Sequence, residues 1–139
     1  MTTTQKSEFK APSQVADDTA SPALITSVAP LLGIWKNIDK STRDLVEIVI
    51  SGSASSPSVQ VYGACSPTPC DWGSVTGIAY AANVSAPEGI AFSALYNFSF
   101  SKVIVVGHLK GRHLDVETFT EFTDGSGRSN LYTSDTMAK

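Results

Sequence analysis

The feature that most constrains the fold is a series of strand-like segments with a period of two, which occupies most of the chain after Gly33. Polar and apolar side chains alternate within these segments, and turns rich in Gly, Pro, Ser and Asp separate them. No segment of helical length and period interrupts the series, so we expect an antiparallel sheet. The expected strands are 34–38, 44–51, 58–64, 72–82, 89–100, 102–109, 112–123 and 128–134.

Eight consecutive strands joined by short turns close most simply into an up-and-down barrel, because closure removes both exposed edges of the sheet. The sequence therefore predicts an all-β protein with an eight-stranded antiparallel barrel, and a β-sandwich is the alternative. Residues 1–21 are polar and show no apolar period, so we expect a disordered tail there and a single domain over 22–139.

A short helix is expected just before the first strand. Ser21 and Pro22 have the residue types that begin a helix, and Leu24, Val28 and Leu31 follow at helical spacing. Such a helix would cover one end of the barrel.

Composition excludes some partners. The chain of 139 residues carries a net charge of −3, whereas a nucleic-acid-binding protein usually presents a basic field. No apolar run approaches the roughly 20 residues that cross a bilayer, and no apolar signal segment follows Met1. We expect no nucleic-acid or membrane partner, and a cytoplasmic protein, or a secreted one if a leader has been removed.

Two cysteines, two prolines, a tryptophan and a glycine crowd into the segment Cys65-Ser-Pro-Thr-Pro-Cys70-Asp-Trp72-Gly73. At a hairpin, this spacing allows a disulfide, whose Cα atoms lie about 4.4–6.8 Å apart. Paired free thiols and a redox pair are the alternatives. A zinc site needs four ligands, and the chain has two histidines besides, so no metal and no cofactor is expected. The segment resembles one found in small uncharacterised bacterial domains.

The segment Gly33-Ile-Trp35-Lys-Asn37-Ile-Asp-Lys-Ser41 resembles the opening of the avidin and streptavidin barrels, in which Gly-x-Trp-x-Asn is followed by Ser four residues later. Its Gly-x-Trp part is also similar to the first strand of lipocalins and related calycin barrels, where the tryptophan closes the barrel bottom. The resemblance implies a calycin-type barrel. In avidins the Asn and Ser hydrogen-bond the ureido group of biotin, and the matching residues here are Asn37 and Ser41.

An eight-stranded barrel has the size at which the interior is either filled or holds one small ligand. The leading hypothesis is therefore a protein that binds a small, largely apolar or aromatic molecule near the open end of the barrel. Aromatic side chains would supply contact area, and polar ones would supply orienting hydrogen bonds. The expected ligand-binding residues are Trp35, Asn37, Ser41, Tyr62, Tyr80, Phe92 and Tyr96.

The second hypothesis is an enzyme that cyclises or isomerises a small organic substrate by holding it in a reactive shape. Its candidate catalytic residues are His108, His113, Asp115 and Tyr96. The histidines flank an expected two-residue hairpin loop, Lys110-Gly111, which would place them opposite each other. The alternative for this face is a solvated outer surface whose charges pair across the strands.

The third hypothesis is a carbohydrate- or protein-interaction module that uses an exposed Trp72. In addition, Leu45 and Val49 are expected on the exposed face of the strand at 44–51, where they would permit a homo-oligomer.

Overall fold

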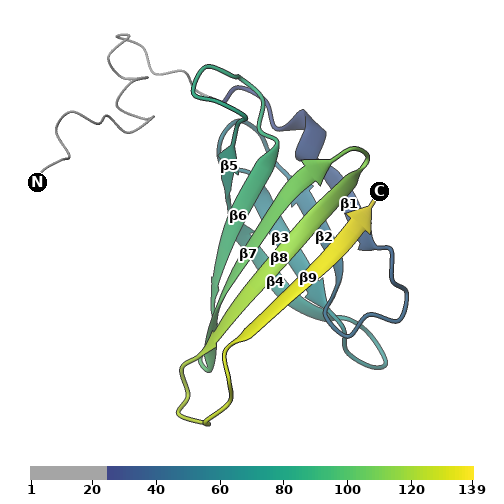
Figure 1. Cartoon of the computed structure of the whole chain (residues 1–139), viewed down its shortest axis with the longest axis vertical. Coiled ribbons are helices and arrows are strands. Elements are labelled where there is room, and N and C mark those ends of the chain that lie inside the picture. The colour runs from purple at the N-terminus through teal and green to yellow at the C-terminus, as the bar shows by residue number, and fades with distance from the viewer. Residues whose placement is uncertain (1–24) are drawn as a thin grey trace, which may run out of the picture.

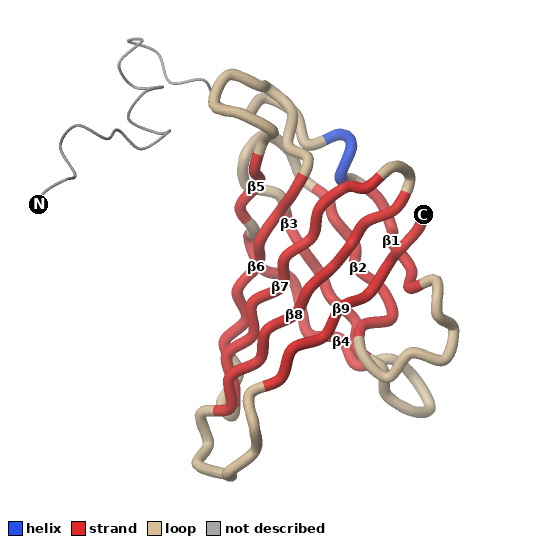
Figure 2. Tube along the Cα trace, in the orientation of Figure 1, coloured by secondary structure: helices blue, strands red, loops and turns tan. Residues whose placement is uncertain are grey.

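The computed structural model describes residues 25–139, so the expected tail at 1–21 lies outside the described residues. Nine antiparallel strands form one sheet in the order β4-β3-β2-β1-β9-β8-β7-β6-β5 (Figure 1; Figure 2). The sheet curls into a nearly closed up-and-down barrel in which the first and last strands are neighbours. The strands are β1 Gly33–Asn37, β2 Leu45–Ser51, β3 Ser58–Gly63, β4 Cys70–Thr76, β5 Ile78–Tyr80, β6 Ala91–Asn97, β7 Ser101–Lys110, β8 His113–Phe122 and β9 Leu131–Ala138.

The barrel has nine strands rather than the predicted eight because the expected strand at 72–82 is divided into β4 and β5. The division falls at Gly77, whose amide donates to the carbonyl oxygen of Pro57, next to β3, at 2.7 Å. One residue later, Ile78 pairs with Ser93 of β6, on the other edge of the sheet. A Cβ atom at Gly77 would lie 2.9 Å from the carbonyl oxygen of Ser93. Glycine permits this close backbone approach, at which the chain crosses between the two edges.

The predicted leading helix begins at Ser21, and its first residues through Leu24 lie outside the described residues. Within residues 25–139 the helical structure is a 3-10 turn, η1 Ala29–Leu31, and no longer helix occurs there. Pro30 lies within this turn and cannot donate the backbone hydrogen bond that would extend it. Leu31 is fully buried, and its carbonyl oxygen accepts a hydrogen bond of 2.8 Å from the indole N–H of Trp35. The turn thus covers the end of the barrel at which β1 begins. None of the helical structure described here has the length and hydropathy to span a membrane.

The β7–β8 hairpin turns one residue later than predicted. Lys110 pairs with His113, so the two-residue loop is Gly111-Arg112, with Gly111 at a φ of +62°. A positive φ at the first loop position is typical of the turns that connect paired strands, and it favours glycine there. The shift moves every cross-strand partner by two residues. The faces of both strands therefore remain as predicted, with Val105 and Val116 in the interior.

Buried apolar side chains fill the middle of the barrel as one continuous cluster. Leu45 belongs to this cluster, with 2% of its surface exposed, although the alternation of β2 places it on the outer face. The reason is a β-bulge between Leu45 and Glu47, which shifts the alternation by one residue. The expected exposed pair Leu45 and Val49 is therefore wrong, and Leu45 cannot contribute to an outer interface.

Candidate functional site

A cavity of about 240 Å³ lies at the end of the barrel opposite the 3-10 turn. The loop that joins β3 to β4 forms one wall, and the inner faces of β8 and β9 form the other. We call this space the mouth cavity. The residues that line it include Leu45, Cys65, Trp72, Thr118, Thr120 and Thr133, and also the charged Arg43 and Asp44.

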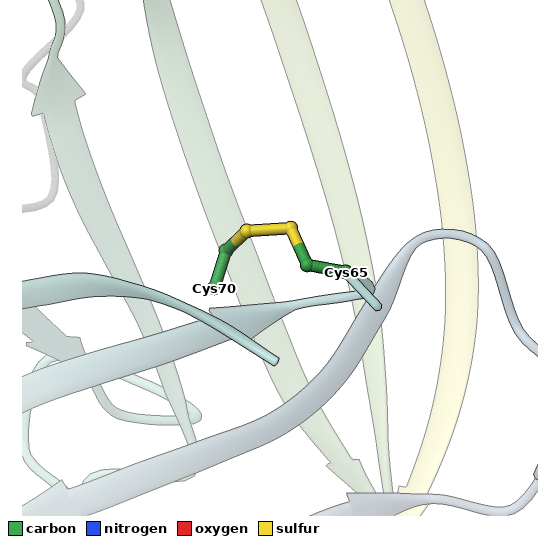
Figure 3. Close-up of a disulfide and its surroundings, with 2 residues drawn as sticks. All are labelled: Cys65 and Cys70. Atoms are coloured by element: carbon green, nitrogen blue, oxygen red, sulfur yellow. A yellow bond between two sulfur atoms is a disulfide. The ribbon is translucent and has the colours of Figure 1, made fainter. Parts of the chain in front are cut away.

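A disulfide between Cys65 and Cys70 holds the first wall, which confirms the predicted pairing (Figure 3). The two Cα atoms are 5.4 Å apart, and Cys70 pairs with Gly63 where β3 ends and β4 begins. The bond therefore closes the β3–β4 loop at its base. This arrangement fixes the position of the loop relative to the cavity.

Trp72 also lines the cavity and is half-buried, with its ring packed against the core. Its ring meets Tyr96 edge-on, with centroids 5.6 Å apart, and meets Phe98 in the same way at 5.7 Å. A Cβ atom at Gly63 would lie 2.9 Å from the indole nitrogen of Trp72, so glycine at that position makes room for the ring. Trp72 is thus a wall residue of the barrel and does not project from it as an exposed recognition side chain.

Threonines form the second wall. Thr118 of β8 and Thr133 of β9 are direct cross-strand partners, and Thr120 follows on the same inner face. Thr118 is 5% exposed, and its Oγ1 atom is buried without a hydrogen-bond partner among residues 25–139. A buried hydroxyl left unpaired costs about 1–3 kcal/mol. Such groups are normally hydrogen-bonded, so this hydroxyl is an exception among the buried polar groups described here.

Asn37 and Asp135 join the strands just beneath the loop at 38–44. The side-chain Nδ2 of Asn37 donates to the backbone carbonyl oxygen of Leu45 at 2.8 Å and to Oδ1 of Asp135 at 2.9 Å. Its Oδ1 accepts a hydrogen bond from the backbone N–H of Asp39. Burial raises the pKa of Asp135, and the carboxylate of Asp44 adds to this effect. Oδ2 of Asp135 is buried without a partner in the described part of the chain.

The structure spreads the seven predicted ligand-binding residues over the molecule, and none of them lines the mouth cavity. Four of them are buried at interior positions along the length of the barrel, namely Trp35, Asn37, Phe92 and Tyr96. Tyr62 and Tyr80 lie on the outer face, where the Tyr80 hydroxyl is 2.9 Å from the hydroxyl of Ser93. Ser41 is exposed in the loop between β1 and β2.

The predicted catalytic candidates are not brought together at a cavity. His108 and His113 are exposed on the outer face of the β7–β8 hairpin, and Nε2 of His108 lies 3.8 Å from Oδ2 of Asp115. Tyr96 points inward, and burial raises its pKa to about 12, which makes its phenol a poor source of a proton at neutral pH. No group of three metal-ligating side chains occurs within residues 25–139.

The sequence analysis did not predict the threonine wall, although the pattern of residues along β8 indicates it. The inner face of β8 reads Leu114, Val116, Thr118, Thr120, so it changes from apolar to polar halfway along the strand. A polar inner face at one end of a barrel strand indicates that the apolar core is incomplete on that strand at that end.

Comparison of the chain with protein-family models, with curated proteins and with solved structures finds no match to any of the three.

Proposed function

We propose that the protein binds a compact small molecule in the mouth cavity. The observation that carries this proposal is the hydroxyl of Thr118, a buried polar group without a partner in the wall of a cavity. The hydroxyl changes direction when χ1 moves between its staggered positions, so it can turn toward a bound group. Because the hydroxyl both donates and accepts, the ligand needs a single donor or acceptor at this point.

The walls limit the chemical class of the ligand. Leu45, Trp72 and the disulfide line one side of the cavity with largely apolar side chains, and Thr118, Thr120 and Thr133 line the facing side. Arg43 and Asp44 also line the cavity and can meet the polar substituent of a ligand. The volume of about 240 Å³ is slightly below the roughly 300 Å³ at which typical ligand pockets begin. A cavity of about 150 Å³ already holds benzene. We therefore infer a ligand built on one ring, or on an apolar group of similar size, that carries one polar substituent.

The barrel architecture supports the proposal in a second way. The 3-10 turn covers one end of the barrel, and at the opposite end the inner face of β8 and β9 is lined by threonines, which leaves space for a guest there. We assign the barrel to the calycin type on the strength of this arrangement and of the opening segment Gly33-Ile-Trp35-Lys-Asn37. A ligand held near the open end is what such an assignment implies.

Phenol and benzene form a matched pair of probes, because they share the ring and differ in the hydroxyl. Titration of each into the protein, followed by amide chemical shifts, gives its affinity and its place of binding. We expect phenol to bind the Thr118→Val variant about three- to tenfold more weakly than the wild type, which corresponds to one lost hydrogen bond. Benzene should bind both proteins equally.

Thr118→Val retains the shape of the side chain, and an unchanged midpoint of thermal unfolding or a higher one would show that the fold is intact. Failure of both probes to shift the amides of the mouth cavity would contradict the proposal. An equal affinity of phenol for the two proteins would also contradict it, because the Thr118 hydroxyl would then take no part in binding.

A further inference from the structure

Four apolar side chains lie side by side on the outer face of the barrel, one on each strand from β6 to β9. The strand pairings place Leu95 beside Ile104, Ile104 beside Phe119, and Phe119 beside Tyr132. Their exposed fractions are 54%, 45%, 44% and 54% respectively. We call these four residues the outer row. Contiguous exposed apolar surface of this kind is typical of an interaction site.

A shallow groove of about 420 Å³ follows the outer row, and Lys102 and Glu121 also line it. These two residues are cross-strand partners on β7 and β8. On the outer face, this pair lies directly beside the pair Ile104 and Phe119 at the centre of the outer row. We call each such cross-strand pair a rung. A positive and a negative charge thus flank the two central apolar side chains on this side. On the other side of the row, the rung of β7 and β8 consists of Val106 and Glu117.

We propose that the outer row is the interface between two copies of this chain, related by a two-fold axis that runs parallel to the strands between β7 and β8. This axis exchanges β7 with β8 and β6 with β9. It therefore places Ile104 of one copy on Phe119 of the other and Leu95 on Tyr132. The same operation places Lys102 of each copy opposite Glu121 of the other, so that both the apolar and the charged groups are complementary.

The charges favour this axis over the other two-fold axis that the row allows. An axis along the row, at right angles to the strands, would exchange the two flanking rungs. Glu121 of one copy would then face Glu117 of the other, and Lys102 would face Val106. Like charges opposed across an interface disfavour that arrangement. The second copy is therefore expected to pack with its strands aligned, as sheets do in a sandwich.

The dimer should be weak. Four strands about 4.8 Å apart and about eight residues long give a face of roughly 500 Å² in projection. A standard interface buries about 800 Å² on each partner, and smaller ones belong to transient complexes. We therefore expect a dissociation constant in the micromolar range, and a protein that is monomeric when dilute and dimeric when concentrated.

Sedimentation velocity over a concentration series from about 1 µM to about 1 mM tests the interface, since this range covers weak association. The wild type should change from monomer to dimer within it, and Phe119→Ser should remain a monomer. Phe100→Ser is the matched control, because Phe100 is 47% exposed but lies outside the outer row. It should dimerise as the wild type does. Circular dichroism checks that both variants retain the fold.

The charge pair tests the axis. Lys102→Glu places two glutamates opposite each other in the dimer, and Glu121→Lys places two lysines there. Each variant alone should dimerise at least tenfold more weakly than the wild type. An equimolar mixture of the two should recover dimers, because Lys and Glu then meet at both contacts of the heterodimer.

A wild type that is monomeric at every concentration would overturn the proposal, as would a dimer that survives Phe119→Ser. Dimers that are weakened by both charge variants but are not recovered in the mixture would overturn the proposed axis.

Discussion

The phenolic oxygen of Tyr96, in β6, lies 2.9 Å from the carbonyl oxygen of Gly73, in β4. These two strands approach each other, but no strand pairing joins them in the described structure, and the barrel is open between them. The same hydroxyl is 3.1 Å from the carbonyl oxygen of Val59, in β3. One buried side chain thus joins three strands across the gap, where a ladder of backbone hydrogen bonds would otherwise be needed.

Tyr96→Phe should destabilise the protein by about 1–2 kcal/mol, because it removes the hydroxyl and leaves two carbonyl oxygens without this donor. Urea unfolding measures the change. Tyr80→Phe is the control, since the Tyr80 hydroxyl meets Ser93 on the exposed outer face. That change should stay within about 0.5 kcal/mol. Equal losses in the two variants would show that the Tyr96 hydroxyl does not hold the gap together.

The disulfide should stabilise the fold modestly. Replacing Cys65 and Cys70 together by serine should lower the free energy of unfolding by about 2 kcal/mol, because the bond closes a short loop and so constrains the unfolded chain little. Reductant should destabilise the wild type to the level of the variant and should have no effect on the variant. If the wild type is equally stable with and without reductant, the bond makes no contribution to stability.

Asp135 should make stability depend on pH. Burial raises the pKa of Asp135 in the native state above its ordinary value of 3.8. At a pH between the pKa of the unfolded chain and the raised pKa of the native state, the native state therefore holds more protons than the unfolded chain. The free energy of unfolding therefore decreases as the pH rises through this window. Asp135→Asn cannot ionise, so its stability relative to the wild type should increase from acid to neutral pH.

Asp124 provides a control of opposite sign. Hydrogen bonds from Ser126 and the charge of Arg128 lower the pKa of Asp124, so its contribution is present above pH 3.8 and is lost as the pH falls through its lowered value. The difference between Asp124→Asn and the wild type should thus be constant from about pH 5 to neutrality. A constant difference for Asp135→Asn from below pH 3.8 to neutrality would contradict the effect of burial on Asp135.

Gly107 makes room for the ring of Phe92. A Cβ atom at Gly107 would overlap the ring of Phe92, which is fully buried. Gly107→Ala should therefore destabilise the protein by about 1–3 kcal/mol through overpacking. Adding Phe92→Leu to Gly107→Ala should cost less than the sum of the two single changes, because the smaller side chain relieves the overlap. Strictly additive losses in urea unfolding would contradict this close contact.

The all-β antiparallel fold and the faces of its strands could be predicted because a period of two is a local property of the sequence. The strand count could not, since the division at Gly77 depends on a backbone approach to Ser93, sixteen residues away. Leu45 was misplaced for a related reason: a β-bulge reverses the alternation and leaves no mark in the residue types.

The disulfide was predictable from spacing, whereas the mouth cavity was not. The aromatic residues were predicted to bind the ligand, but Phe92 and Tyr96 are buried in the core. The unpaired hydroxyl of Thr118 becomes visible once the depth of the apolar cluster along the barrel is known. A sequence pattern shows which face of a strand points inward, but it does not show where the core ends.

The most direct test of the account is to locate a bound ring by intermolecular nuclear Overhauser effects between phenol and the methyl groups of the protein. We predict contacts from the phenol ring to the methyl groups of Thr118, Thr133 and Leu45, which line the mouth cavity. Contacts confined to Ile104 and Leu95 of the outer row, or no contacts with saturating phenol, would contradict a binding site at the mouth of the barrel.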